Sequence, residues 1–376
     1  MATGVRVVNL DDFQPLSRWK LLSLGRQVQA WVQRGFQVTL LGRREDLAYF
    51  SLVNGVPLDD EPAEIHRPVM LSEVLDYLQV QPGMVVVDAT AGAGGHTEAL
   101  ARAVGPRGKV IALDRDPEMV RLAQKRLQAY PQAQVLHADF ARLPEVLAQL
   151  GLQEVHAVLF DLGLSSYHLD RAGRGFTFRK AEPLDLRFDP QEGRPASWYL
   201  NRAPRPFLEA VFRLYGEEPL ARRLAQAITQ ARERRPLETT DDLNALIDRW
   251  VPVHRRARTR ARVYQALRIL VNRELDRVAE GLAGALEVLS RNGRLVILSY
   301  HSLEDRLAKA LKDLQGVEPL TRKPLRPQDT EIRRNPRARS AKLRAYRKTG
   351  ELDRGEVIRH YLRSFVPHPG GHLDVL

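Results

Sequence analysis

A glycine-rich turn and an acidic residue at a fixed distance beyond it form the first candidate site for chemistry. The turn Gly92–His96 follows a short apolar run that ends at Asp88, and Asp114 ends the next apolar run, 22 residues after Gly92. Such a turn lets the backbone approach a ligand, and a carboxylate at the second position can accept hydrogen bonds from both hydroxyls of a ribose. The pattern predicts a nucleoside-binding site made by Gly92, Gly94, Gly95, His96 and Asp114.

Three details favour S-adenosylmethionine (AdoMet) over NAD as the cofactor. The turn lacks the G-x-G-x-x-G spacing that cradles a pyrophosphate. The carboxylate of Asp88 beside the turn would repel a pyrophosphate but suits the cationic ammonium and sulfonium groups of AdoMet. After the third apolar run, Asp139 offers an acceptor for an adenine amino group and Phe140 a ring for its face. Helix capping by Asp88 and Asp139, and core packing of Phe140, are the structural alternatives.

Asp161 is the candidate catalytic residue. It ends the fourth apolar run and opens the stretch Asp161–Ser166. Because ligands bind outside the carboxyl ends of the strands in doubly wound sheets, Asp161 should meet both the cofactor and the acceptor. The stretch is not a G-x-S-x-G nucleophile elbow, and no histidine pair has the spacing of metal ligands. We therefore expect no catalytic metal.

The elements that would position these residues alternate in type. Short β-branched runs separated by helical periodicity predict an α/β fold with a doubly wound parallel sheet. The predicted strands are Met84–Asp88, Val110–Leu113, Val135–His137, Val155–Phe160 and, later in the chain, Arg294–Ser299. Between residues 173 and 280 only helical periodicity occurs, and Ala261–Leu289 reads as one helix. An all-helical insertion within the sheet domain is the resulting expectation.

These patterns divide the chain into parts. The expected parts are an N-terminal extension of unknown role at 1–65, a sheet domain at 66–172 and 281–348, the helical insertion at 173–280 and a C-terminal tail at 349–376. The segment from Pro319 onward is basic and punctuated by proline, so we expect it to run over the surface.

Composition and charge narrow the class of partner. The chain has no cysteine, which excludes disulfides and cysteine nucleophiles, and its net charge is +12. Residues 249–273 hold eight arginines and no acid, and residues 319–348 hold eleven basic residues against two acids. Such local surpluses predict a polyanionic partner such as a nucleic acid. No apolar run approaches the roughly 18 residues of a membrane helix, so we expect a cytoplasmic protein without a membrane partner.

Motifs in consistent order resemble the MraW family, the ribosomal RNA small subunit methyltransferases H. The matching stretches between residues 66 and 348 are His66–Leu71, Asp88–His96, Asp114–Pro117, Asp161–Ser166, Arg174–Phe178, Pro183–Arg187, Tyr264–Ile269 with Asn272, Ser299–Arg306 and Asn335–Arg344. The resemblance implies a Rossmann-like AdoMet-dependent methyltransferase sheet with an inserted all-helical substrate-recognition domain. It also implies N4-methylation of one cytidine, flipped out of its stack, in the decoding region of 16S rRNA.

The resemblance also assigns roles to residues. It implies cofactor contacts at Gly94, Gly95, His96, Asp114, Phe140, Asp161 and position 168, where the family has Gln after Pro and this chain has Tyr167 and His168. The candidate substrate contacts are Arg174, Phe176, Arg187, Arg268, Asn272, His301, Ser302, Arg337 and Arg339, with Arg258 and Arg262 in a stretch that departs from the family's His-Pro-Ala-Thr-Arg run.

The partner implied by the resemblance is 16S rRNA within the small ribosomal subunit. The sequence does not decide the oligomeric state, and a homodimer is one of the alternatives. Two other classes of function are still to be separated from this one. The glycine turn and Asp114 are shared with NAD-dependent oxidoreductases, and a non-catalytic RNA-binding assembly factor would keep the same fold and the same basic segments.

Overall fold

The computed structural model describes residues 5–9, 24, 28, 37–41, 68–170 and 172–364. The chain divides into two compact units, Met1–Ile65 and His66–Leu376. In the first unit, strands β1 (Val5–Asn9) and β2 (Gln37–Leu41) pair in parallel. Most of the N-terminal extension, and the last residues of the C-terminal tail, lie outside the described residues.

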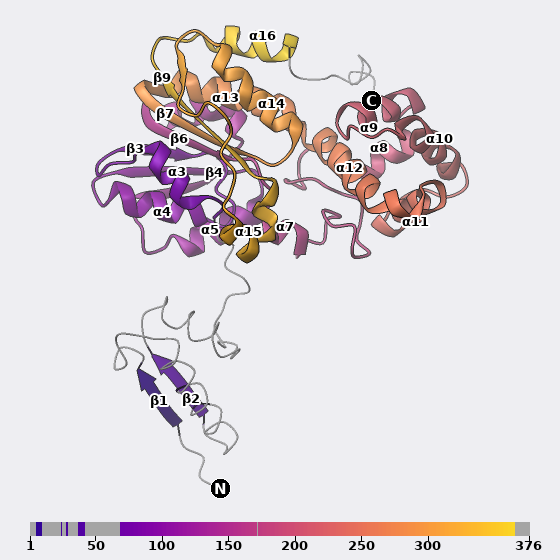
Figure 1. Cartoon of the computed structure of the whole chain (residues 1–376), viewed down its shortest axis with the longest axis horizontal. Coiled ribbons are helices and arrows are strands. Elements are labelled where there is room, and N and C mark those ends of the chain that lie inside the picture. The colour runs from indigo at the N-terminus through magenta and orange to yellow at the C-terminus, as the bar shows by residue number, and fades with distance from the viewer. Residues whose placement is uncertain are drawn as a thin grey trace. The chain divides into compact units, whose positions relative to one another are not determined.

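The second unit is built on a seven-stranded sheet, which confirms the predicted Rossmann-like α/β fold (Figure 1). Its order is β5-β4-β3-β6-β7-β9-β8. The strands are β3 (Val85–Asp88), β4 (Lys109–Asp114), β5 (Ala133–His137), β6 (Val155–Asp161), β7 (Leu289–Ser299), β8 (Val317–Pro319) and β9 (Lys342–Lys348). Strands β3 to β7 pair in parallel, whereas β9 runs antiparallel to both β7 and β8.

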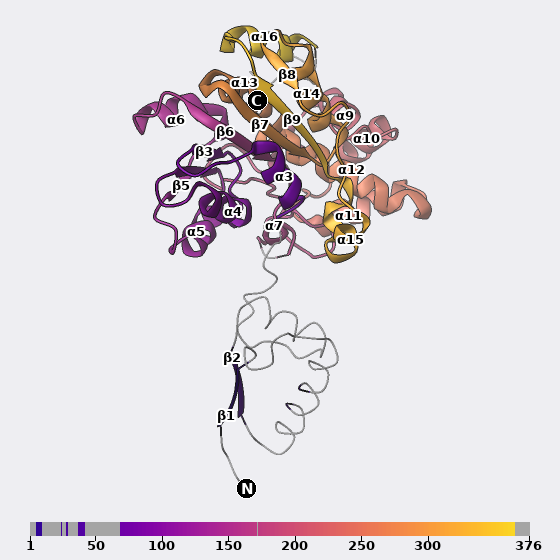
Figure 2. The ribbon, with the colours of Figure 1, turned by 60° about the vertical axis from the view of Figure 1, so that its left-hand side comes forward.

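Helices cover both faces of this sheet because successive strand side chains point to opposite sides. On β3, Val86 packs into one buried cluster and Val87 into another. One face carries α3 (Leu71–Leu78), α4 (Gly95–Val104) and α5 (Pro117–Arg126). The other carries the short helix η2 (Phe140–Arg142), α6 (Leu143–Gln149), α13 (Glu274–Val288), α14 (Ser302–Ala310) and α16 (Arg354–Ser364) (Figure 2). Both faces of the central strands are therefore buried.

The helical segment lies beside the sheet and contains five of the described helices (Figure 1). They are α8 (Ala196–Arg202), α9 (Arg205–Leu214), α10 (Ala221–Arg232), α11 (Thr240–Trp250) and α12 (Val253–Asn272). Helix α11 has the bounds that its sequence predicts, because Thr239 and Asp242 form a reciprocal capping box at its start.

The prediction of one helix over Ala261–Leu289 is wrong. Arg273 adopts a left-handed backbone conformation with φ of 49°, which ends α12 and starts α13 in a new direction. Helix α13 packs on η2, α6 and β7, so it belongs to the sheet layer. The expected boundary at residue 280 falls inside α13, and the helical segment ends instead at Asn272.

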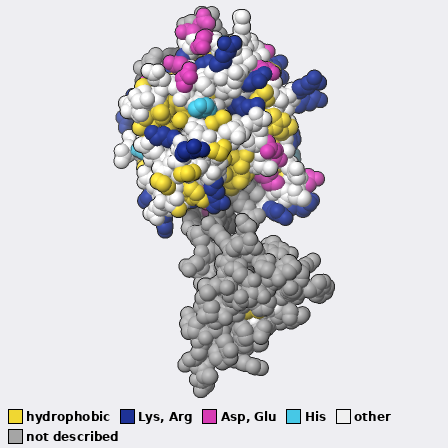
Figure 3. Space-filling model, turned by 90° about the vertical axis from the view of Figure 1, so that its left-hand side faces the viewer, with side chains coloured by type: hydrophobic (Ala, Val, Ile, Leu, Met, Phe, Trp, Pro, Cys, Tyr) yellow, Lys and Arg dark blue, Asp and Glu magenta, His cyan; other side chains and the backbone are white. Residues whose placement is uncertain are grey.

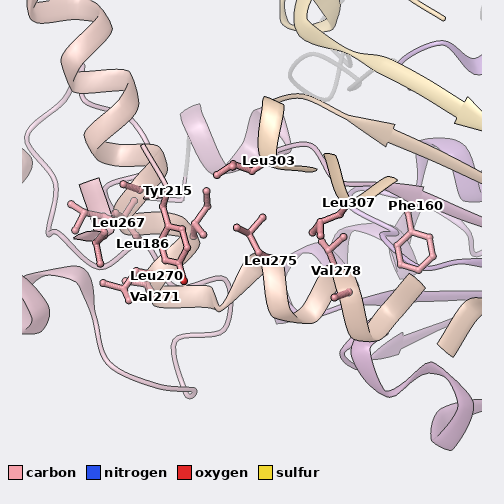
Figure 4. Packing of buried hydrophobic residues seen from close by; sticks show 14 of the residues in the cluster. Phe160, Leu186, Tyr215, Leu267, Leu270, Val271, Leu275, Val278, Leu303 and Leu307 are labelled. Carbon is pink, nitrogen blue, oxygen red and sulfur yellow. The ribbon is translucent and has the colours of Figure 1, made fainter. Parts of the chain in front are cut away.

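One continuous apolar cluster joins the helical segment to the sheet. It runs from α12 through α13 to β6, and Figure 4 shows the side chains that form this path. The residues labelled along it are Leu186, Tyr215, Leu267, Leu270, Val271, Leu275, Val278, Leu303, Leu307 and Phe160. Because the cluster is shared, the helical segment is held against the sheet by core packing rather than by a flexible tether.

The expectation that the chain from Pro319 onward runs over the surface is wrong for strand β9, which lies between β7 and β8. Two of its basic residues are buried with partners. Arg344 donates to Asp305 Oδ1 over 2.8 Å, and the Lys348 ammonium donates to the Leu289 carbonyl over 2.7 Å. The remaining described elements are α7 (Ser166–Asp170), η3 (Leu311–Asp313), α15 (Asp329–Arg334) and η4 (Pro336–Ser340).

Among the described residues, no helix is both long enough and apolar enough to cross a lipid bilayer.

Candidate active site

The candidate site lies at the carboxyl ends of β3, β4 and β6. The chain winds from β3 toward β5 in one direction and from β6 toward β7 in the other, so the strand order reverses between β3 and β6. At such a reversal the loops diverge and leave a crevice. The glycine-loop cleft found here holds about 960 Å³ of empty space. It brings together Gly92, Gly95, His96, Asp114, Phe140, Asp161 and His168 from the predicted cofactor residues.

Asp114 holds the glycine turn in place. Its Oδ2 accepts a hydrogen bond from the Gly92 amide over 2.8 Å, and its Oδ1 accepts one from the Asp116 amide over 2.9 Å. Burial raises the pKa of Asp114, and these two amide donors oppose that rise. Each oxygen keeps a second lone pair, so the carboxylate can still accept a hydroxyl.

Two predicted cofactor residues do not line the cleft. Asp88 is fully buried, and its oxygens accept hydrogen bonds from the Thr97 hydroxyl over 2.7 Å and from the Thr90 amide over 3.2 Å. Gly94 has φ of 85°, and a Cβ there would lie 3.3 Å from Ala123 of α5. Both residues therefore hold the glycine turn in place without lining the cleft. Asp88 links β3 to α4 through Thr97, and the missing side chain of Gly94 lets α4 pack closely against α5.

Asp139 does not offer its carboxylate to the cleft either. Its Oδ1 caps η2 by accepting from the Ala141 amide, and its Oδ2 is paired with Arg115 and Arg277. Phe140 does line the cleft, and its ring packs edge-on against Phe160 with centroids 5.4 Å apart. The structure therefore gives no support to the adenine contact predicted for Asp139, whereas Phe140 lines the cleft as predicted.

His168 lies at the wall of the cleft, against two aromatic rings that stack on each other. Its ring centroid is 5.1 Å from that of Phe176 and 5.2 Å from that of Phe188. Its Nε2 pairs with Asp116 Oδ2 over 2.9 Å, but its buried Nδ1 has no hydrogen-bond partner within the described part of the chain. Burying a polar atom without a partner costs stability, so Nδ1 is suited to meet a polar atom of a bound ligand.

Asp161 is oriented from three sides. Its backbone amide donates to Thr90 Oγ1 over 2.6 Å, and its Oδ1 accepts from the Tyr300 hydroxyl over 2.8 Å. Its Oδ2 lies 3.5 Å from His96 Nδ1, while the other ring nitrogen of His96 contacts the Val69 carbonyl over 3.0 Å. Because a carbonyl only accepts, that second nitrogen carries a proton.

A second cavity, the aromatic pocket, adjoins the cleft and holds about 1160 Å³ of empty space. The rings on its wall are Phe176, Phe178, Tyr264 and Tyr300. Asp161, Leu162, Gly163 and Glu304 line both the cleft and the pocket. The Asp161 carboxylate therefore stands where a group held in the cleft and a planar group held in the pocket would meet.

Comparison with known proteins assigns the family. The model of the MraW methylase family matches residues 63–349. The chain belongs to the MraW methylase family. The ribosomal RNA small subunit methyltransferase H of Thermomicrobium roseum is 43% identical over 309 residues, which cover 77% of this chain and 95% of that protein. The protein of that name from Dictyoglomus thermophilum is 41% identical over 289 residues, covering 76% of this chain and 97% of that one.

Among solved structures, an rRNA methylase from Streptococcus thermophilus superposes with a TM-score of 0.37 at 14% identity, covering 77% of this chain and 100% of that chain. Membership of the MraW family makes the chain a methyltransferase with AdoMet as its cofactor, and it excludes the NAD-dependent oxidoreductase. The cleft fits this cofactor, because its lining includes the carboxylate-bearing Asp114, the aromatic Phe140 and His168, whose Nδ1 has no hydrogen-bond partner among the described residues.

In this MraW family member, three predicted substrate contacts support the fold instead. Arg174 donates to the carbonyls of residues 187 and 188 and to Asp116, and its side chain is 12% exposed. Asn272 is 2% exposed, and its Oδ1 accepts from the Phe188 amide. Arg187 is held by Asp185 at 2.7 and 2.8 Å and lines neither cavity. Together they fix the loop between α7 and α8 against the end of α12.

Four predicted substrate residues do line the aromatic pocket. They are Phe176, Arg268, His301 and Arg337. Arg268 is paired with Glu274 at 2.7 and 3.0 Å, and Arg337 with Asp170 at 2.9 and 2.8 Å. Ser302 instead donates to Glu217 over 2.8 Å outside the pocket.

The remaining predicted arginines differ in their surroundings. Arg262 lies 3.8 Å from Glu218. Arg258 and Arg339 are exposed, and the described residues offer their side chains no ion-pair or hydrogen-bond partner. Arg344 and Lys342, which belong to the same basic segment as Arg339, both donate to Asp305.

Sequence reasoning missed Glu304 and the contact between Tyr300 and Asp161. Glu304 lines both cavities and is 2% exposed, and its Oε2 accepts from the Tyr300 amide over 2.8 Å. Its position three residues after His301 is that of a capping box, which was the available signal. The ring of Tyr300 lines the aromatic pocket, and its hydroxyl reaches Asp161, a contact that no local pattern indicates.

Glu274, His301 and Glu304 bring ligand atoms within 4.8 Å of one another. Arg268 contributes a guanidinium to this group through its bidentate pair with Glu274. The carboxylates therefore have a cationic partner from the protein itself.

Proposed function

We propose that the protein uses AdoMet to methylate the exocyclic N4 amine of one cytidine in the decoding region of 16S rRNA, on a base flipped into the aromatic pocket. The observation that carries the proposal is the position of Asp161 on both the glycine-loop cleft and the aromatic pocket. A residue at that junction can contact an acceptor amine while the cofactor occupies the cleft.

The relatives support the choice of polymer. Curated proteins at 38–43% identity over most of this chain bear the name ribosomal RNA small subunit methyltransferase H. We extend that substrate to this chain, with the small ribosomal subunit as the form of the RNA and the cytoplasm as the location. The surplus of arginine in residues 249–273 is what a phosphate backbone requires.

The aromatic pocket suits an extruded base. A base that is stacked within an RNA helix cannot present its exocyclic amine to an enzyme. The base must therefore leave the stack, at a cost of a few kcal/mol. Aromatic side chains offset part of that cost by stacking on the base, roughly 1–3 kcal/mol each. Phe178 and Tyr264 pack edge-on with centroids 5.6 Å apart and form one wall of the pocket.

The chemistry of N4 methylation makes positioning the main task. The lone pair of the amine is delocalised into the cytosine ring, which makes the nitrogen a poor nucleophile. AdoMet supplies, when bound, a methyl group on a sulfonium that is itself a good leaving group. The protein then has to align the amine with that methyl group, and alignment of this kind can contribute about 7–11 kcal/mol.

Asp161 is the residue that would hold the amine. Its Oδ2 accepts one amine proton, which draws the nitrogen lone pair out of conjugation and directs it toward the methyl carbon. Oδ1 is occupied by the Tyr300 hydroxyl, so the carboxylate cannot rotate freely. As the new bond forms, the proton held at Oδ2 leaves the nitrogen and restores a neutral amine.

Nucleoside analysis tests the proposal directly. Small ribosomal subunits from cells that lack this protein are incubated with the purified enzyme and methyl-labelled AdoMet, and the digested RNA is analysed by mass spectrometry. The expected product is labelled N4-methylcytidine at one position. Label on another atom or base would overturn the assignment, and no label at all would favour the non-catalytic assembly factor.

A further inference from the structure

One face of α12 leads directly out of the aromatic pocket. Ala261, Gln265 and Arg268 of this helix line the pocket. Arg258 precedes Gln265 by seven residues, or two helical turns, so both side chains leave the same face about 10 Å apart along the axis. Arg255 lies about one turn further, near the exposed start of the helix at Val253.

The arginines of α12 are either paired with an acid or unpaired, and Arg262 and Arg268 are paired with Glu218 and Glu274. Arg256 and Arg260 face α11, where Asp248 pairs with them at 3.7 and 2.6 Å. Arg255 and Arg258 are exposed, and their side chains find no ion-pair or hydrogen-bond partner within the described ranges. The unpaired cations are therefore the ones on or next to the face that continues from the pocket.

The unpaired arginines destabilise helix α12. Like charges one turn apart repel, and the first turn of α12 contains no acid to complement the positive end of its dipole. An anion bound along this face would remove both penalties. Arg223 and Arg249 add positive charge at the same corner, where their guanidinium carbons lie 5.4 and 6.0 Å from the centre of the Trp250 ring.

The surface on the other side of the sheet domain is different. On the face that Figure 3 shows, Lys and Arg side chains stand scattered among apolar and acidic ones and do not form a line. The scattered charges on that face contrast with the two unpaired arginines that follow the pocket along α12.

We propose that the RNA strand carrying the target base leaves the aromatic pocket along this face of α12, with Arg258 and Arg255 neutralising phosphates next to the target nucleotide. The inference rests on the proposed function, since it requires an RNA substrate. To that function it adds the path by which the RNA strand leaves the pocket and the two arginines that bind its phosphates. An acidic protein segment is the other occupant that such a face could take.

The test measures binding of a single-stranded oligoribonucleotide that contains the target cytidine. Arg258→Glu and Arg255→Glu are compared with Arg234→Glu, because Arg234 is also exposed in the helical segment and its side chain has no partner among the described residues. We expect each of the first two to weaken binding about tenfold or more, while Arg234→Glu stays within about twofold of wild type. Replacing Arg258 by Ala should also reduce the slope of log K against log salt by about one.

Neutral methylphosphonates in the RNA locate the contact. A methylphosphonate within about three nucleotides of the target should weaken binding to the wild type and have little further effect on Arg258→Ala, because the same ion pair is removed twice. Arg258→Lys should recover most of the affinity. The affinity for AdoMet should be that of the wild type in all these variants, because no described residue of α12 lines the glycine-loop cleft.

Three results would separate the possible failures. If the wild type methylates RNA but Arg258→Glu and Arg255→Glu bind like Arg234→Glu, the strand path is wrong and the proposed function stands. If these variants bind the oligonucleotide normally but fail only on assembled subunits, the face contacts a ribosomal protein and the RNA path is again wrong. If the wild type neither binds nor methylates the RNA, the proposed function is wrong, and the strand path that rests on it is wrong as well.

Discussion

The hydroxyl of Tyr300 donates a hydrogen bond to Oδ1 of Asp161 over 2.8 Å, across 139 residues of sequence. Gly163 makes this contact possible, since a Cβ at that position would lie only 2.6 Å from Cε2 of the Tyr300 ring. Burial, together with the neighbouring Asp161 carboxylate, raises the pKa of Tyr300 well above its ordinary value. The phenol therefore stays protonated and keeps donating at alkaline pH. Tyr300 acts as a positioning residue for Asp161.

Replacing Tyr300 by phenylalanine should lower the single-turnover rate of methyl transfer by roughly 10- to 100-fold, the value of one hydrogen bond to a charged group. The affinity for AdoMet should change little, because the ring still fills its place. Tyr346→Phe is the matched control, since Tyr346 is also buried and donates to the Ala308 carbonyl over 2.7 Å outside both cavities. Equal effects of the two substitutions would show that Tyr300 serves the fold alone.

Asp161→Asn should abolish turnover more than it weakens cofactor binding. The asparagine keeps the size of the side chain but loses the charge that holds the amine proton as the lone pair turns toward the methyl carbon. Rates under single-turnover conditions and AdoMet affinity by calorimetry, measured on the same variant, decide the matter. Losses of the same size in both quantities would reduce Asp161 to a binding residue.

Asp114→Ala should weaken AdoMet binding by roughly 2–5 kcal/mol, because two charge-assisted hydrogen bonds to the ribose would be lost. The same carboxylate also holds the Gly92 amide, so part of the loss would come from the turn. Calorimetric titration with AdoMet checks this. A dissociation constant within a factor of two of the wild type would refute the ribose contact.

Asp116→Asn should lower the thermal midpoint at pH 7 by an amount on the order of 5 °C, because it breaks a buried pair. Burial alone would raise the pKa of Asp116, but His168 and Arg174 bring it below its ordinary value of 3.8. A carboxyl with a depressed folded-state pKa contributes stability above its ordinary pKa, and that contribution is lost as pH falls through the folded value. The difference between variant and wild type should therefore shrink at pH 3. Thermal melts at both pH values test this, and a difference that does not depend on pH would contradict it.

The sequence by itself determined the sheet and the place of the cofactor cleft. Apolar β-branched runs separated by helices can bury both faces only as a doubly wound sheet, and in such a sheet strand ends meet at one edge. The positions of Asp114, Phe140 and Asp161 follow from that geometry, because Asp114 and Asp161 come directly after predicted strands and Phe140 comes three residues after one. Family motifs then identified the methyltransferase.

Only the tertiary structure decided which charged residues face a cavity and which are paired. Asp88 ends a strand as Asp114 does, and Asp139 lies two residues after one, yet Asp88 is hydrogen-bonded by Thr97 and Asp139 is paired with two arginines from other elements. Strand β9 was misread for the same reason, since the partner of Arg344 is Asp305, 39 residues away. Whether an arginine such as Arg258 or Arg260 is unpaired depends on a neighbouring helix, here on Asp248 of α11. Local sequence fixes the periodicity of an element, but the partner of a charge is set by contacts between residues distant in the chain.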